Sequence, residues 1–61
     1  MEGIKEILMR RDGMSEEEAE DHIFDARETL REYLDLGDIE AAEGICNEFF
    51  GLEPDYLMEL L

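Results

Sequence analysis

Two stripes of opposite character run through residues 15–36 and limit what this chain can fold into. An apolar set recurs at intervals of 4, 3, 4 and 3 residues: Ala19, Ile23, Ala26, Leu30 and Tyr33. An acidic set, called the acidic ridge below, repeats these intervals two residues later: Asp21, Asp25, Glu28, Glu32 and Asp35. At about 100° per residue the two sets lie roughly 200° apart around one helix. The pattern therefore predicts a continuous helix over 15–36, with the apolar face buried and the ridge in solvent.

Both ends of this helix carry signals. Ser15 is placed to accept a hydrogen bond from the amide of Glu18, and the Glu18 carboxylate to accept one from the Ser15 amide, which makes a capping box. Gly37 follows Leu36 and readily takes the left-handed conformation in which many helices end. The short link to Asp38 predicts a helical hairpin with the segment that follows.

Two shorter helices are predicted on either side of the long one. Residues 2–12 place three apolar side chains on one face before Gly13: Ile4, Ile7 and Leu8. A third helix starts at Asp38, a good N-cap, and ends at Phe50-Gly51. Its apolar face consists of Ile39, Ala42, Ile45, Cys46 and Phe49. Gly44 lies inside this helix at a cost of about 1 kcal/mol relative to Ala, and we expect its missing side chain to permit close packing.

The last residues form a short tail. Pro54 suits the first turn of a new helix, and Leu52 and Leu57 stand at the positions of a hydrophobic staple. The tail is strongly apolar: Tyr56, Leu57, Leu60 and Leu61. We interpret it as closing the core, with an adhesive surface as the alternative. Residues 1–61 are thus predicted to form one all-α domain, with three principal helices plus a short C-terminal helix or turn.

The charge of the chain is strongly negative and unevenly distributed. Its 19 acidic and 5 basic residues give a formal net charge of −14. Residues 1–14 are neutral, residues 15–36 hold nine carboxylates against Arg27 and Arg31, and residues 37–61 hold seven carboxylates and no base. Such a field opposes direct binding to nucleic acid or to an anionic membrane, and it favours a basic partner.

The sequence contains no signal for membrane insertion or secretion. No stretch approaches the roughly 20 apolar residues of a membrane span, and the first residues lack the apolar run of a signal peptide. Cys46 is the only cysteine, which excludes an intramolecular disulfide framework. We expect a cytoplasmic protein.

Three constellations of reactive residues are too weak to assign a chemistry. His22 lies one turn after Glu18, but two ligands do not make a metal site. Cys46 is not assigned as a nucleophile with His22 as its base, because it falls on an apolar helix face. The EF-hand spacing fails after Asp35, where Gly37 takes the place of an oxygen ligand. We predict no enzyme, no cofactor and no metal.

The acidic ridge is the stronger candidate site. From Glu16 to Asp35, nine carboxylates span about 29 Å, or one per roughly 3 Å, close to the roughly 3.4 Å phosphate repeat of one DNA strand. We predict that the ridge, with Phe24 beside it, binds a basic surface of another protein. The alternative without a function is that the ridge is a solvated helix face on which Arg31 pairs with Glu28 and Asp35. Residues 2–12 or the tail would then cover Phe24.

A different class of function is also open. The chain is alternatively a self-associating structural module that forms a homo-oligomer. Its interface would then consist of apolar residues near the C-terminus: Phe50, Leu57, Leu60 and Leu61. The two interpretations differ in which face of the domain meets a partner.

Three segments lie at the predicted helix joints: Arg11-Asp12-Gly13-Met14-Ser15-Glu16-Glu17-Glu18-Ala19, Gly37-Asp38 with Ala42-Glu43, and Phe50-Gly51-Leu52-Glu53-Pro54-Asp55-Tyr56. Together they resemble small acidic proteins encoded by phages and other mobile elements of Gram-positive bacteria. The resemblance implies a fold and a context, and it assigns no role to any residue. Since small acidic phage products often bind host proteins, including defence and nucleic-acid enzymes, we expect an inhibitor that blocks a basic, nucleic-acid-binding surface.

Overall fold

The computed structural model describes residues 2–61, and every regular element among them is helical. These elements are α1 (Ile4–Asp12), α2 (Glu16–Asp35), α3 (Ile39–Glu43), α4 (Ile45–Phe50) and the 3-10 helix η1 (Pro54–Glu59). The all-α prediction is confirmed. Within residues 2–61, no helix has the length and apolar character needed to cross a bilayer.

The long helix α2 begins and ends where its signals predict. Ser15 Oγ accepts a hydrogen bond from the Glu18 amide at 3.1 Å, and the Ser15 amide donates to Glu18 Oε1 at 3.2 Å. At the other end Gly37 has φ 74°, and the amides of Gly37 and Asp38 donate to the carbonyls of Leu34 and Tyr33. This pair of bonds is a Schellman motif, which satisfies carbonyl groups that the helix itself leaves open.

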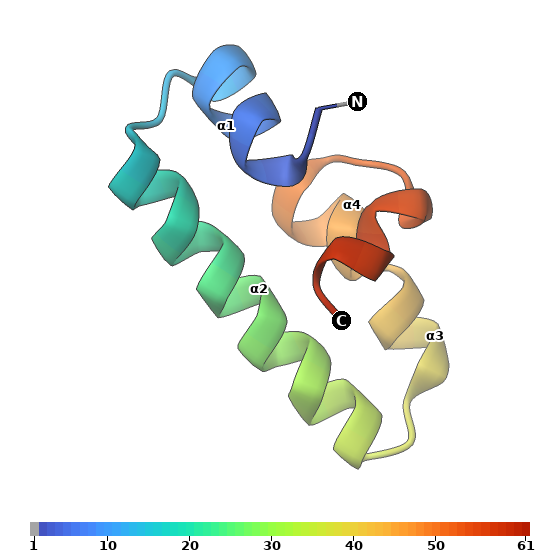
Figure 1. The fold of residues 1–61 in the computed structure, drawn as a ribbon. Coiled ribbons are helices and arrows are strands. Elements are labelled where there is room, and N and C mark those ends of the chain that lie inside the picture. The colour runs from blue at the N-terminus through green and yellow to red at the C-terminus, as the bar shows by residue number, and fades with distance from the viewer. Residues whose placement is uncertain (1) are drawn as a thin grey trace.

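Helix α2 forms one edge of the molecule, and the other elements pack against a single side of it (Figure 1). α1 lies beside its N-terminal half, while α3 and α4 return alongside it and η1 packs on α4. Every helix except η1 contributes to the buried cluster, and the residue after η1 completes it: Ile4, Leu8, Ala19, Ala26, Leu30, Ala42, Ile45, Cys46, Phe50 and Leu60. Within residues 2–61, no element covers the opposite side of α2.

The predicted third helix is wrong as a single element, because it divides at Gly44 into α3 and α4. Gly44 has φ −86° and ψ 0°, and its amide bonds to the carbonyls of Glu40 and Ala41. A Cβ at this position would lie 3.7 Å from the nearest atom, the Ala41 oxygen, so close packing does not require glycine here. The tight turn at Gly44 separates α3 from α4, and Ile39, expected on the buried face, is 54% exposed.

The C-terminal tail closes the core, as we interpreted it from the sequence. Leu52 and Leu57 are half-buried against the core cluster, and Leu60 is buried within it. The Ile4 amide donates a hydrogen bond to Glu59 Oε1 at 3.1 Å, which ties η1 to the start of α1. Leu61 remains exposed.

Two glycine substitutions test this description of the helix joints. Gly44→Ala should raise the free energy of unfolding by about 0.5–1 kcal/mol, because the residue has negative φ and a methyl group meets only ordinary contacts. The matched variant Gly37→Ala should lower it by about 1 kcal/mol, because alanine resists the left-handed conformation and nothing lies near the added carbon. Urea unfolding followed by circular dichroism measures both. Effects of the same sign would contradict the assignment.

Candidate functional site

All five carboxylates of the acidic ridge are exposed on α2. They lie on the side of the helix away from the core, because the residues of the apolar set are buried or half-buried. This is the side that no other element covers (Figure 1). The ridge is thus a continuous surface along most of the longest element.

The ridge carboxylates have no cationic partner within residues 2–61. The ion pairs in this part of the chain join Lys5 to Glu16 and Glu20, Arg10 to Glu2, and Arg11 to Asp12. Within residues 2–61, Arg31 forms no ion pair with Glu28 or Asp35, although the alternative without a function included those pairs. The ridge is therefore available to an external cation.

The carboxylates of the ridge are more widely spaced than the average over all nine carboxylates of α2. Lys5 contacts Glu16 at 3.0 Å and Glu20 at 3.1 Å, and its hydrogen bonds with both raise its pKa. Glu18 is engaged in the capping box. From Asp21 to Asp35 the ridge covers about 21 Å, with one carboxylate per roughly 5 Å. This spacing is sparser than the roughly 3.4 Å repeat of DNA phosphates, so the likeness to a nucleic-acid strand is weaker than the sequence predicts.

Phe24 lies beside the ridge and is 58% exposed, so neither α1 nor the tail covers it. Its position on α2 is next to Glu28 on one side and to Arg27 on the other, judged from the helical period. Phenylalanine is enriched at protein interfaces relative to the rest of the surface.

Two of the four residues of the predicted self-association surface are buried within the single chain. Phe50 and Leu60 are each 2% exposed and belong to the core of the single chain. Leu57 is half-buried against that core, and Leu61 alone is exposed. The reason is that a chain of this size has few other apolar residues to bury.

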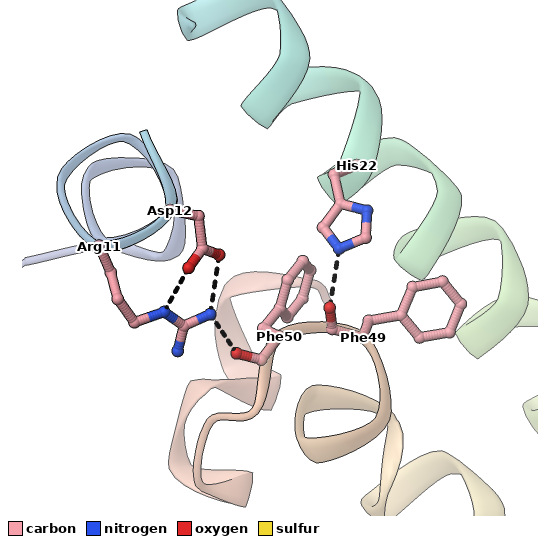
Figure 2. A network of polar contacts seen from close by, with 5 residues as sticks. All are labelled: Arg11, Asp12, His22, Phe49 and Phe50. Carbon is pink, nitrogen blue, oxygen red and sulfur yellow. Dashed lines mark hydrogen bonds and ion pairs between the residues drawn. The ribbon is translucent and has the colours of Figure 1, made fainter. Parts of the chain in front are cut away.

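A polar joint that the sequence did not reveal connects α1, α2 and α4 at the end of α4 (Figure 2). Arg11 donates to the carbonyl of Phe50 at 2.6 Å and to both carboxylate oxygens of Asp12 at 2.9 Å. His22 Nε2 lies 2.7 Å from the carbonyl oxygen of Phe49, and its ring meets that of Phe50 edge to face at 5.1 Å. These five residues, called the polar joint below, bring together segments far apart in the sequence.

The polar joint satisfies the last carbonyl groups of α4. The helix ends at Gly51, which has φ 66° and whose amide bonds to the Asn47 carbonyl. Such an ending leaves the carbonyls of Phe49 and Phe50 without an intrahelical donor. His22 and Arg11 supply those donors from two other helices. The joint is therefore structural, and His22 lies at the boundary of the core with its Nε2 engaged.

The thiol that was considered as a nucleophile is not accessible. Cys46 is fully buried, and burial raises the pKa of its thiol above the ordinary value of 9.0. A protonated, inaccessible thiol packs as a small apolar side chain. Within residues 2–61, no three His, Cys, Asp or Glu side chains lie close enough together to hold a metal ion.

Replacing His22 tests the role of the polar joint. His22→Leu should lower the free energy of unfolding by about 1–2 kcal/mol, because the half-buried Phe49 carbonyl loses its donor. His22→Gln is the matched control, since its amide group can still donate to that carbonyl. Chemical denaturation of both variants gives the comparison. Equal stability of the two variants would show that this hydrogen bond does not contribute.

Removing Arg11 should change the titration of Asp12. The hydrogen bonds from Arg11 lower the pKa of the Asp12 carboxyl below its ordinary value of 3.8. The contribution of this pair to stability is therefore complete above that value and is lost as the pH falls through the lower pKa of the folded state. In Arg11→Met, NMR titration should show the Asp12 pKa rising toward 3.8. An unchanged pKa would mean that the pair does not persist in solution.

Comparison with known proteins does not assign this chain to a family. No protein-family model matches it, and neither does any curated protein or solved structure. The resemblance to small acidic phage proteins therefore stays a prediction. What the chain binds has to be argued from its own surface.

Proposed function

We propose that this chain is a non-catalytic binding module whose acidic ridge docks on a basic surface of another protein. The observation that carries the proposal is the row of five exposed carboxylates on α2, none of which has a cationic partner within residues 2–61. All five lie on one continuous helix. A lysine- or arginine-rich surface is the complementary chemistry.

The rigidity of α2 supports this function. The helix is capped at both ends and buried along its apolar face, so the spacing of the ridge is set before a partner arrives. A preorganised surface loses less conformational entropy on binding than a flexible acidic tail does. The net charge of −14 adds long-range attraction that accelerates encounter with a cationic partner and weakens as salt is added.

Phe24 adds an apolar contact to this electrostatic surface. Exposed charge pairs at an interface rim contribute little individually, whereas a buried aromatic anchor often dominates the binding free energy. With 58% of its surface exposed beside the ridge, Phe24 has area to bury. The proposed partner therefore presents an apolar notch next to its basic residues.

The proposed context is a phage or mobile element whose product inhibits a host protein. It rests on the resemblance of the helix joints and on the sign of the charge. Large basic surfaces are typical of nucleic-acid-binding proteins, so we propose such a surface as the target. The roughly 5 Å spacing of the ridge fits discrete basic side chains better than it imitates a phosphate repeat.

Charge reversal on the ridge tests the proposal. Glu28→Lys with Glu32→Lys, used in affinity capture from the cytosol of a Gram-positive host, should lose the partner that the native chain retains. Glu43→Lys with Glu48→Lys is the matched control, since it changes the net charge equally at exposed positions of α3 and α4.

With the captured partner purified, the ridge variant should bind at least about tenfold more weakly than the control variant, and native binding should weaken with salt. Circular dichroism checks that both variants keep their helicity. If both variants lost the same affinity for the partner, the loss would be due to net charge and not to the ridge. If the ridge variant bound as tightly as the native chain, the docking role would be refuted.

A further inference from the structure

A second surface of α2 has the opposite chemistry to the ridge. A groove of about 140 Å³ opens between the C-terminal half of α2 and the residues after η1. It is lined by two arginines and four leucines: Arg27, Leu30, Arg31, Leu34, Leu60 and Leu61. We call it the arginine groove. Leu30 and Leu60 are buried at its base, while Leu34 and Leu61 are exposed beside it.

Neither arginine of this groove contacts a carboxylate within residues 2–61. Arg27 donates to the backbone carbonyl of Glu59 at 3.4 Å, a long bond, and Arg31 makes no hydrogen bond or ion pair in the described part of the chain. By contrast, Lys5, Arg10 and Arg11 all pair with carboxylates. In a chain with 19 acidic residues, two guanidinium groups without a carboxylate partner beside an apolar groove are the exception.

The charge and size of the arginine groove limit the class of ligand that it could bind. A guanidinium group presents a planar fork of donors that matches a carboxylate, and residues four apart on a helix lie side by side. A cavity of about 150 Å³ holds benzene, so this groove accommodates roughly six carbon atoms. The nearby ridge carboxylates penalise a doubly charged anion such as phosphate more than a monoanion.

We propose that the arginine groove binds a small aliphatic monocarboxylate. The carboxylate lies between Arg27 and Arg31, and a branched alkyl group of leucine size packs on Leu30, Leu34 and Leu60. Because the groove lies on the flank of α2 that faces the tail, this site is separate from the ridge. Its occupancy does not depend on the proposed function.

Titration with 4-methylpentanoate, followed by two-dimensional NMR of the full ¹⁵N-labelled chain, tests the site. We expect saturable shifts of the amides of Arg27, Arg31, Leu34 and Leu61, at ligand concentrations on the order of millimolar. The matched amide, 4-methylpentanamide, keeps the alkyl group without the charge, and acetate keeps the charge without the alkyl group. Each should bind at least about tenfold more weakly.

Single substitutions locate the charge that recognises the ligand. Within residues 2–61, Arg31→Gln removes no hydrogen bond or ion pair, and it should weaken binding about tenfold. Arg10→Gln removes one positive charge from α1, outside the groove lining, and should leave binding unchanged. Arg31→Lys keeps the charge and loses the planar fork of donors, so its affinity for the ligand should lie between those of the other two variants. It replaces Arg31→Gln in the test if that variant is poorly folded. The ridge variant Glu28→Lys with Glu32→Lys should keep or strengthen the binding, which separates this site from the ridge.

Three results would overturn the proposal. The first is an absence of saturation up to about 50 mM ligand. The second is equal binding of the acid and the amide, and the third is native affinity in Arg31→Gln.

Discussion

Burial of one stripe of α2 is the interaction on which the rest of this small domain depends. A chain of about 60 residues buries only about 60% of the surface of its unfolded form, and α1, α3, α4 and η1 are all too short to be stable as isolated helices. Each therefore needs the apolar side of α2, or a neighbour packed on it, as its support. Because four short elements crowd onto one side, the other side of the long helix stays in solvent.

The five Lys and Arg residues of the chain fall into two groups. Lys5, Arg10 and Arg11 pair with carboxylates near α1, and Arg11 also caps the end of α4. Arg27 and Arg31 remain over the apolar groove at the other end of α2. The acidic ridge is left without any of the five. The acidic ridge is therefore purely negative, because the basic side chains either pair with carboxylates near α1 or lie on a different flank of α2.

The polar joint shows how the domain manages the end of a six-residue helix. The carbonyl groups there need donors that neither the helix nor the glycine turn provides. Donors from α1 and α2 supply them, so the same contacts that satisfy α4 also hold three helices in place. In a core this small, a few such hydrogen bonds add specificity to packing that apolar burial alone leaves adjustable.

The sequence by itself determined the bounds of α2, the buried and exposed faces of that helix and the all-α class, because periodicity and capping are local properties of the chain. It also located the ridge and Phe24. Only the tertiary structure decided that the helix after Asp38 divides at Gly44, that Phe50 and Leu60 are core residues, and that Arg31 stays unpaired. It alone revealed the polar joint and the arginine groove. The physical reason is distance along the chain: the joint connects residues 27 and 39 positions apart, and no local pattern records which side chains meet across such separations.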